Sequence, residues 1–358
     1  MRVAVVHDWL TVYGGAERVL EQILKLYPDA DLYSVIDFFP SDLRSHLLDK
    51  KAKTTFIQKI PLSKRLYPYL LPLMPFAIEQ LDLSKYDLVI SSSYAVAKGV
   101  ITNPDQLHIC YCHSPMRYAW DLQSQYLKKK GDLMARFVFH KMRGWDLRSS
   151  FRVDRFIANS HFVARRIEKV YRRKAEVISP PVDLSSFPLQ KEKEEYYVTS
   201  GRMVTYKKLD LLIKAFRRLP EKKLVVIGDG PLRKKMEKLA TKNVEFLGGV
   251  SEEVLSEKLG KARAYLFAGV EDFGIAPLEA QSTGTPVIAF GKGGVWETCQ
   301  DTGHFFVSQT EEGVIDAIRD FEATPSVSPE ACRENAERFS IKQFQTQFQN
   351  FVERCVNR

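Results

Sequence analysis

The sequence predicts an α/β protein built of two doubly wound domains, each a parallel sheet covered by helices. The chain has 358 residues, more than one ordinary hydrophobic core holds. In its second half, five apolar runs each end at a glycine, and a helical pattern follows each run. The first half opens in the same way. A repeated strand, turn and helix is typical of a parallel sheet with helices on both faces.

The first half contains six strand-like apolar runs. They are residues 2–8, 31–36, 87–92, 107–112, 154–159 and 175–180, and a helix is expected over 16–27. The connections 37–80 and 114–150 are longer than the connections of the second half. Insertions of this kind usually serve recognition.

The second half alternates more regularly. Its expected strands are 195–201, 223–230, 243–249, 264–269 and 285–291, and its expected helices are 208–219, 232–240, 252–262, 276–284 and 295–300. Segment 181–198 is polar, charged and bounded by prolines, which favours an interdomain linker. The last helical pattern, 341–356, has an apolar side formed by Phe344, Phe348, Phe351 and Val352.

These patterns give the domain boundaries. We expect an N-terminal domain over 1–188 and a C-terminal domain over 189–341, with the helix 342–358 returning to the N-terminal domain. Two such domains leave a cleft between them. Ligands of open parallel sheets bind at the carboxyl ends of the strands, so candidate residues are sought directly after strands.

The positive charge is unevenly distributed. Residues 1–190 hold 28 Lys and Arg against 19 Asp and Glu, which accounts for the whole net charge of +9. The basic residues concentrate in 44–65 and 128–155, and the apolar stretch 66–78 is broken by three prolines. This stretch is read either as a buried segment or as a patch that enters a lipid interface. A basic half favours an anionic partner, either a membrane surface or nucleic acid, although no nucleic-acid-binding module is present.

The five cysteines form no C-x-x-C pair, so neither a disulfide framework nor a zinc site is expected. The first residues lack the features of a signal peptide. We therefore expect buried thiols and a cytoplasmic protein, with peripheral contact at the inner face of the cell membrane as a further expectation.

Two carboxylates lie near one strand end. Glu271 follows the expected strand 264–269, Gly274 precedes the next helix, and Glu279 lies one turn inside that helix. A helix N-terminus offers N–H donors and partial positive charge to an anion. Arg202 and Lys207 follow the expected strand 195–201 and can reach a diphosphate. Preorganised cations at developing negative charge are usually the largest catalytic contribution.

These motifs resemble those of retaining glycosyltransferases of family 4, which have the GT-B fold of two Rossmann-like domains. The resemblance rests on E-x7-E from Glu271 to Glu279 within "EDFGIAPLEAQSTGTPVIAFGKGGVWE", and on "GRMVTYKK", "VVIGDGP" and "VEFLGGVS". Lys208 stands where many members have glycine. "HDWLTVYGGAERVL" and "YCHSPMRYAWDL" resemble a bacterial mannosyltransferase subgroup that builds surface polysaccharide and O-antigen.

The resemblance implies roles for particular residues. Glu271 would hold donor-sugar hydroxyls, Glu279 the ribose, and Arg202 and Lys207 the leaving diphosphate. His113, after strand 107–112, would face the reacting sugar. The implied catalytic residues are Glu271, His113, Arg202 and Lys207, and the implied donor-binding residues are Gly14, Gly15, Arg202, Lys207, Gly228, Val250, Glu271, Phe273, Gly274, Ile275, Ala276 and Glu279.

No metal and no cofactor are expected. Asp29 and Asp31 form a D-x-D string, but they precede a strand and so should point away from the ligand-binding edge. The expected reaction is retaining transfer of mannose from GDP-mannose to a hydroxyl of a lipid-linked glycan.

Other functions remain open at this point. They are a transferase that uses a UDP-sugar, a nucleotide-sugar epimerase, a glycoside hydrolase and a non-catalytic nucleotide-sugar-binding protein. An epimerase product would stay linked to the nucleotide. A hydrolase would release sugar without nucleoside diphosphate.

Overall fold

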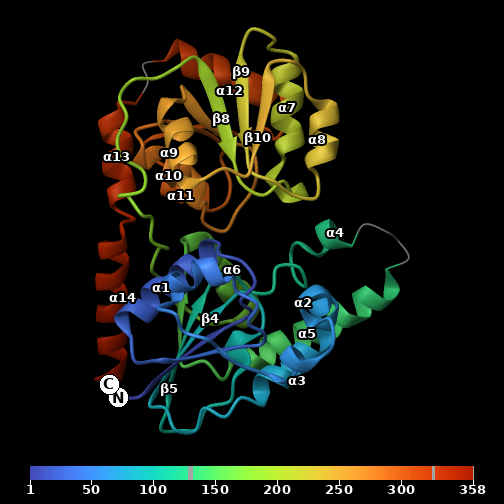
Figure 1. Cartoon of the computed structure of the whole chain (residues 1–358), viewed down its shortest axis with the longest axis vertical. Coiled ribbons are helices and arrows are strands. Elements are labelled where there is room, and N and C mark those ends of the chain that lie inside the picture. Colours follow the sequence, from blue (N-terminus) through green and yellow to red (C-terminus); the bar gives the residue numbers. More distant parts are fainter. Residues whose placement is uncertain (128–131, 325–326, 358) are drawn as a thin grey trace. The chain divides into compact units, whose positions relative to one another are not determined.

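The computed structural model describes residues 1–127, 132–324 and 327–357 and divides the chain into two compact units. Unit 1 comprises Met1–Pro181 and Lys342–Arg358, and unit 2 comprises Val182–Ile341. Each unit is a parallel sheet covered by helices (Figure 1). The predicted α/β class with two Rossmann-like domains is therefore confirmed.

Unit 1 contains a seven-stranded sheet in the order β3-β2-β1-β4-β5-β6-β7, and every pairing is parallel. Its strands are β1 (Val3–His7), β2 (Asp31–Ser34), β3 (Lys53–Thr54), β4 (Leu88–Ser93), β5 (Leu107–Cys112), β6 (Arg155–Ala158) and β7 (Ala175–Val177). Its α-helices are α1 (Gly15–Leu26), α2 (Ser63–Leu66), α3 (Met74–Glu79), α4 (Gln123–Tyr126), α5 (Leu133–Ser150), α6 (His161–Tyr171) and α14 (Ile341–Val356). The sheet order reverses between β1 and β4, so the carboxyl ends of these strands form its switch point.

Unit 2 contains a six-stranded parallel sheet in the order β10-β9-β8-β11-β12-β13. Its strands are β8 (Tyr196–Ser200), β9 (Lys223–Ile227), β10 (Val244–Gly248), β11 (Ala264–Phe267), β12 (Val287–Phe290) and β13 (Gly303–Phe306). Its α-helices are α7 (Leu209–Arg217), α8 (Arg233–Leu239), α9 (Glu252–Lys261), α10 (Ile275–Ser282), α11 (Gly294–Thr298), α12 (Glu311–Ala323) and α13 (Pro329–Glu337). The switch point lies between β8 and β11.

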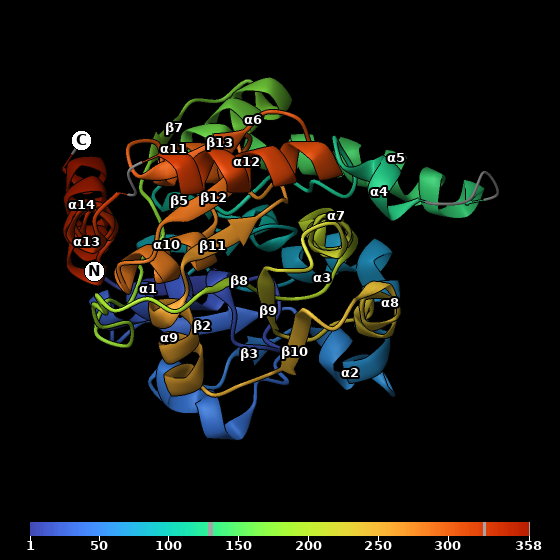
Figure 2. The ribbon, with the colours of Figure 1, turned by 90° about the horizontal axis from the view of Figure 1, so that it is seen from above.

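The two faces of the unit 2 sheet have separate cores. One core contains side chains of α7, α8 and α12, and the other contains side chains of α9, α10 and α11. Figure 2 shows α7 and α8 on one side of β8 and β9, and α9 and α10 on the other. The sixth strand, β13, was not predicted, because "GHFF" is shorter than the other runs and begins with two residues that are not apolar.

Helix α14 packs within unit 1. Its four apolar side chains, Phe344, Phe348, Phe351 and Val352, share a core with residues of α1, β1, β4 and β5. Burial of each such side chain contributes about 1.5–3 kcal/mol. The amphipathic pattern of this helix is thus explained by a core that the first residues of the chain build.

The predicted linker is wrong as a description of 181–198. Phe187 is completely buried in the core of unit 2, and Val182 packs against Phe273 and Leu278. The Val182 N–H also donates to the Phe339 carbonyl at 2.8 Å. Segment 182–188 therefore belongs to unit 2, and the boundary lies at Pro181 instead of residue 188.

The two long connections of unit 1 are folded. The first forms 3₁₀ helices η1 (Ser41–Leu47), η2 (Phe56–Lys59) and η3 (Tyr67–Leu73) together with β3, α2 and α3, and the second contains α4 and α5. Helices α3 and α5 contribute to one core and lie side by side (Figure 1). Residues 128–131, which include "KKK", lie outside the described residues. Among the helices described, none has both the length and the apolar character needed to cross a membrane.

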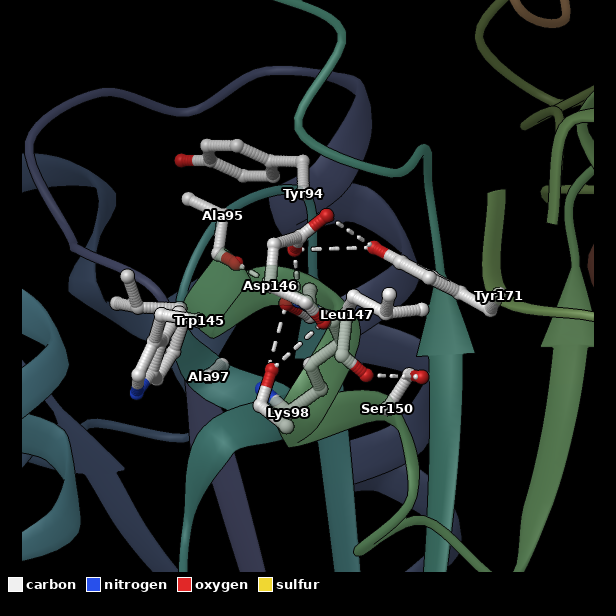
Figure 3. A network of polar contacts seen from close by, with 12 residues as sticks. Tyr94, Ala95, Ala97, Lys98, Trp145, Asp146, Leu147, Ser150 and Tyr171 are labelled. Carbon is white, nitrogen blue, oxygen red and sulfur yellow. Dashed lines mark hydrogen bonds and ion pairs between the residues drawn. The ribbon is translucent and has the colours of Figure 1, made fainter. Parts of the chain in front are cut away.

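A buried ion pair joins the second of these connections to the loop after β4. Lys98, in η4 (Ala97–Gly99) after β4, pairs with Asp146 of α5, and both side chains are almost completely buried. Asp146 also accepts hydrogen bonds from Tyr171 (Figure 3). A further hydrogen bond comes from Trp120 at 2.7 Å. Lys98 donates further to the Ala95 carbonyl at 3.2 Å. The network holds the loop after β4 in place.

Candidate active site

The unit 2 switch point brings two of the predicted residues into direct contact. Lys207 ends the 3₁₀ helix η5 (Thr205–Lys207), which follows β8, and Glu271 follows β11. Lys207 Nζ lies 3.0 Å from Glu271 Oε1, and each side chain is 18% exposed. Both groups therefore remain accessible to a ligand at the sheet edge where doubly wound folds bind one.

The pair keeps Lys207 charged. Burial alone would lower the pKa of Lys207, but the charge and hydrogen bond of Glu271, together with Tyr265 and Tyr206, hold this pKa above its usual value. Gly201, at φ 123°, lies against the Lys207 amine, and a Cβ at this position would collide with Lys207 Nζ. The backbone angle favours glycine there, and a side chain would displace the amine from its place beside Glu271.

Arg202 is exposed and lines the same hollow as Lys207. Within the described part of the chain, its guanidinium makes no hydrogen bond to a side chain. The site therefore presents one cation held by a carboxylate and a second that is available to an anion.

Lys208 adopts the conformation for which glycine is favoured. Its φ is 54°, in the left-handed region, and it directly precedes α7. The turn implied by the resemblance is thus formed even though a lysine occupies it.

The N-terminus of α10 lies beside the ion pair along the chain. Gly274 precedes the helix at φ 96°, and Ile275 and Ala276 are its first residues, so their N–H groups lack partners within the helix. The Phe273 side chain is buried against Phe339, with ring centroids 5.7 Å apart. Only its backbone can contact a ligand, as the resemblance implies.

Glu279 lies one turn inside α10 and is only 6% exposed. Gly228 follows β9 at φ 115°, and its N–H donates to the Gly248 carbonyl at 2.6 Å. Val250 follows β10. Since β8, β9 and β10 are neighbours and parallel, these residues share one sheet edge with Lys207.

The glycine loop 291–294, for which no role was predicted, supports Glu271. The Gly294 N–H donates to the Glu271 carbonyl at 2.9 Å. A Cβ at Gly293 or Gly294 would collide with the backbone of Glu271 or Phe273. The "GKGG" string after β12 was the available signal, because paired glycines often mark close backbone approach.

Unit 1 holds the remaining predicted residues. Gly14 precedes α1 and Gly15 begins it, after β1, while His113 follows β5. The Gly14 N–H donates to Glu17 Oε2 at 2.9 Å, so this donor is already occupied. Burial lowers the pKa of His113 to about 3, and its ring is therefore neutral at neutral pH.

His113 is the end of a polar chain that the sequence analysis did not predict. His113 Nε2 lies 2.8 Å from Ser92 Oγ, and Ser92 Oγ lies 3.1 Å from His7 Nδ1. His7 Nε2 in turn lies 3.3 Å from Glu17 Oε1. His7 and Ser92 are register partners on β1 and β4, at the switch point of the sheet.

Asp8, directly after β1, has a structural role. Its carboxylate accepts four backbone N–H groups, from residues 94, 95, 96 and 97, at 2.5–3.0 Å. Burial nevertheless raises its pKa. Asp8 therefore shapes the loop after β4, and its oxygens are already occupied.

The D-x-D string, Asp29 to Asp31, lies at the amino end of a strand, away from the carboxyl ends where ligands bind. Asp31 begins β2, and its carboxylate pairs with Lys53 at 2.9 Å and with Lys85 at 3.4 Å. Hydrogen bonds from Tyr86 and then Lys53 lower the pKa of Asp31 to about 2. Lys53 is thus engaged within unit 1, although it was counted among the basic residues expected to face an anionic partner.

The predicted residues therefore form two groups. Within unit 2 the structure brings together Arg202, Lys207 and Glu271, with the α10 N-terminus and the ends of β9 and β10 on the same sheet edge. Within unit 1 it brings His113 and the start of α1 to one sheet edge, through Ser92, His7 and Glu17.

Comparison with known families agrees with this architecture. Residues 13–186 match the family described as Glycosyltransferase Family 4, and residues 183–339 match the family described as Glycosyl transferases group 1. The chain belongs to the glycosyltransferases with the GT-B fold.

Individual relatives are distant. The chain is 24% identical over 265 residues to the alpha-1,3/1,6-mannosyltransferase alg2 of Schizosaccharomyces pombe, covering 60% of this chain and 51% of that protein. It is 31% identical over 147 residues to the GDP-mannose-dependent alpha-(1-6)-phosphatidylinositol monomannoside mannosyltransferase of Mycolicibacterium smegmatis, covering 36% of this chain and 38% of that protein. The matches thus span about a third to a half of these relatives' own length.

Solved structures share the fold over the full chain. Sucrose-phosphate synthase from Thermosynechococcus elongatus has a TM-score of 0.77 at 17% identity and is covered completely, as is this chain. Anabaena HepE in complex with UDP-glucose has a TM-score of 0.74 at 17% identity, covering 99% of this chain and 100% of that one.

Proposed function

We propose that the protein is a retaining hexosyltransferase that moves mannose from GDP-mannose to a hydroxyl of a lipid-linked glycan in surface polysaccharide synthesis. The observation that carries the proposal is the Lys207–Glu271 pair at the switch point of unit 2, beside an exposed Arg202. The mannosyltransferases among the distant relatives support mannose as the sugar.

The proposed roles follow from charge and position. Arg202, Lys207 and the first N–H groups of α10 would bind the diphosphate, whose negative charge grows as the bond to the sugar breaks. Glu271 would accept hydrogen bonds from sugar hydroxyls, and Glu279 from the ribose. Retention would arise because the acceptor attacks on the face from which the phosphate leaves, and this phosphate would take the acceptor's proton.

A thermal-shift panel of GDP, UDP, ADP and their sugars tests the donor. A ligand at a hundred times its Kd adds about 2.7 kcal/mol to the free energy of unfolding. We expect GDP and GDP-mannose to raise the melting temperature more than the other nucleotides. A larger rise with UDP would favour a UDP-sugar donor, which the UDP-glucose complex of the similar Anabaena structure makes the second candidate. No rise with any nucleotide would contradict the proposal.

A lipid-linked acceptor requires access to a membrane surface, and unit 1 carries a suitable patch. Residues 56–78 contain no acidic residue. We define the basic-apolar patch by its exposed side chains, which are Phe56, Lys59, Leu62, Lys64, Arg65, Leu66, Tyr69, Leu73 and Phe76. Phe56 and Phe76 contact each other, with ring centroids 5.8 Å apart. Exposed apolar side chains flanked by cations fit an anionic lipid surface.

Sedimentation with anionic liposomes tests this contact. Each basic side chain near such a surface contributes about 1 kcal/mol. The triple variant Lys59→Gln, Lys64→Gln, Arg65→Gln should therefore bind about a hundredfold more weakly at low salt. The control removes three exposed charges from α8 of unit 2, at Lys234, Lys235 and Lys238, and should bind as the wild type does. Wild-type protein that stays in the supernatant would refute the membrane contact.

A further inference from the structure

The exposure of its members shows which end of the polar chain in unit 1 can reach a ligand. The two inner members, His7 and Ser92, are completely buried, whereas His113 keeps 8% of its surface exposed. Only the His113 end can therefore reach a ligand. The other end is Glu17, whose carboxylate accepts hydrogen bonds and donates none.

The direction of each hydrogen bond follows from Glu17. Because Glu17 accepts at Oε1, His7 Nε2 carries a proton and donates it. In the proposed arrangement His7 holds only this one proton, so its Nδ1 accepts from the Ser92 hydroxyl. Because the Ser92 hydroxyl donates its only proton to His7, its oxygen accepts from His113 Nε2–H. The lone pair of His113 is left on Nδ1.

We propose that Glu17, His7 and Ser92 are positioning residues that hold His113 as its Nε2–H tautomer. In this tautomer, Nδ1 accepts a hydrogen bond from a hydroxyl of the sugar that is transferred or of its acceptor. The consequence for turnover rests on the proposed function, but the tautomer itself does not. Neither His7 nor Ser92 was predicted as a site residue.

The chain offers a matched control on the adjacent residue. Ser91 Oγ lies 2.8 Å from His108 Nε2, and both residues are completely buried. Successive side chains of a strand point to opposite faces of a sheet, so Ser91 and Ser92 serve different histidines. Ser92→Ala removes two buried hydrogen bonds, to His7 and His113, whereas Ser91→Ala removes one, to His108. Ser92→Ala should therefore lose more stability than Ser91→Ala, and the histidine signals distinguish a local effect on His113 from a general loss of stability.

Nitrogen-15 NMR of histidine-labelled full-length protein reads the tautomers directly. The chain has seven histidines, and a His113→Asn variant assigns the His113 signals. We expect His113 to show a protonated Nε2 and an unprotonated Nδ1. Ser92→Ala should give His113 the averaged signals of two tautomers, and Ser91→Ala should leave them unchanged. An Nδ1–H tautomer in the wild type, or unchanged His113 signals in Ser92→Ala, would overturn the proposal.

Steady-state kinetics test the consequence. Ser92→Ala should lower kcat by about tenfold to a hundredfold, the cost of a slightly misplaced positioning group, with the KM for the donor within about twofold. Ser91→Ala should leave both constants within about twofold of wild type. Equal kcat values in the two variants would refute the positioning role. A wild-type enzyme that transfers no sugar would instead contradict the proposed function, and the NMR result would still decide the tautomer.

Discussion

Replacing Lys207 with alanine is expected to lower kcat by about 10²–10³, the usual cost of removing one preorganised charged donor. Lys207 is held 3.0 Å from Glu271 and lies over Gly201, so its amine is already fixed where a diphosphate would bind. The charge on the leaving phosphate is greatest in the transition state. The loss should therefore appear in kcat more than in the affinity for the nucleoside diphosphate.

Two further variants separate this effect from other causes. Glu279→Ala should mainly raise the apparent KM for the donor, because Glu279 is proposed to hold the ribose and not the breaking bond. Lys214→Ala removes a cation of α7 that is 41% exposed and lies 3.8 Å from Glu311, and it should change kcat by less than about twofold. Nucleoside diphosphate release, measured over a range of donor concentrations, gives kcat and KM for all three variants. A Lys207→Ala enzyme with the wild-type kcat would remove Lys207 from the mechanism.

Replacing Asp146 with asparagine is expected to destabilise unit 1 by about 3–5 kcal/mol, the usual cost of leaving one buried charge without its partner. Asparagine keeps the size of the side chain and can still accept a hydrogen bond from Trp120 or Tyr171. The change therefore isolates the charge opposite Lys98, whose side chain is only 2% exposed (Figure 3).

Urea unfolding followed by tryptophan fluorescence measures this loss. Three of the four tryptophans, Trp9, Trp120 and Trp145, lie in unit 1, so the signal reports mainly on that unit. The double variant Lys98→Met, Asp146→Asn should recover much of the stability, because no unpaired charge is left.

An exposed ion pair of the same unit provides the control. Glu176 and Arg354 lie 2.6 Å apart but are 47% and 54% exposed, so Glu176→Gln should cost about 0–1 kcal/mol. If Asp146→Asn cost no more than Glu176→Gln, the buried pair would not be what holds the loop after β4.

Predictions about single strands and their ends agreed best with the structure. The apolar runs that end at glycine in the second half correspond to β8–β12, because burial on both faces of a parallel sheet leaves a nearly continuous apolar run. The strand "GHFF" was missed because a short run with a polar second residue carries little of this signal. The sequence also predicted correctly that Lys207 and Glu271 follow strands, because the glycine that ends each apolar run marks the end of the strand.

Segment 182–188 was wrongly predicted to be part of a linker. The prolines and charges of 181–198 resemble those of a linker, yet Phe187 is completely buried among residues of β8, β11 and α10. The sequence pattern around one phenylalanine does not say which distant residues surround it. Only the folded chain supplies those contacts.

The sequence by itself determined the α/β class, the repeat of strand and helix, and the residues that follow each strand, because local burial and turn geometry leave a periodic trace. It did not determine which side chains meet. The pairing of Lys98 with Asp146, and the chain from Glu17 through Ser92 to His113, join residues 10 to 85 positions apart. Strand order and register bring such residues together, and these depend on the packing of the whole unit.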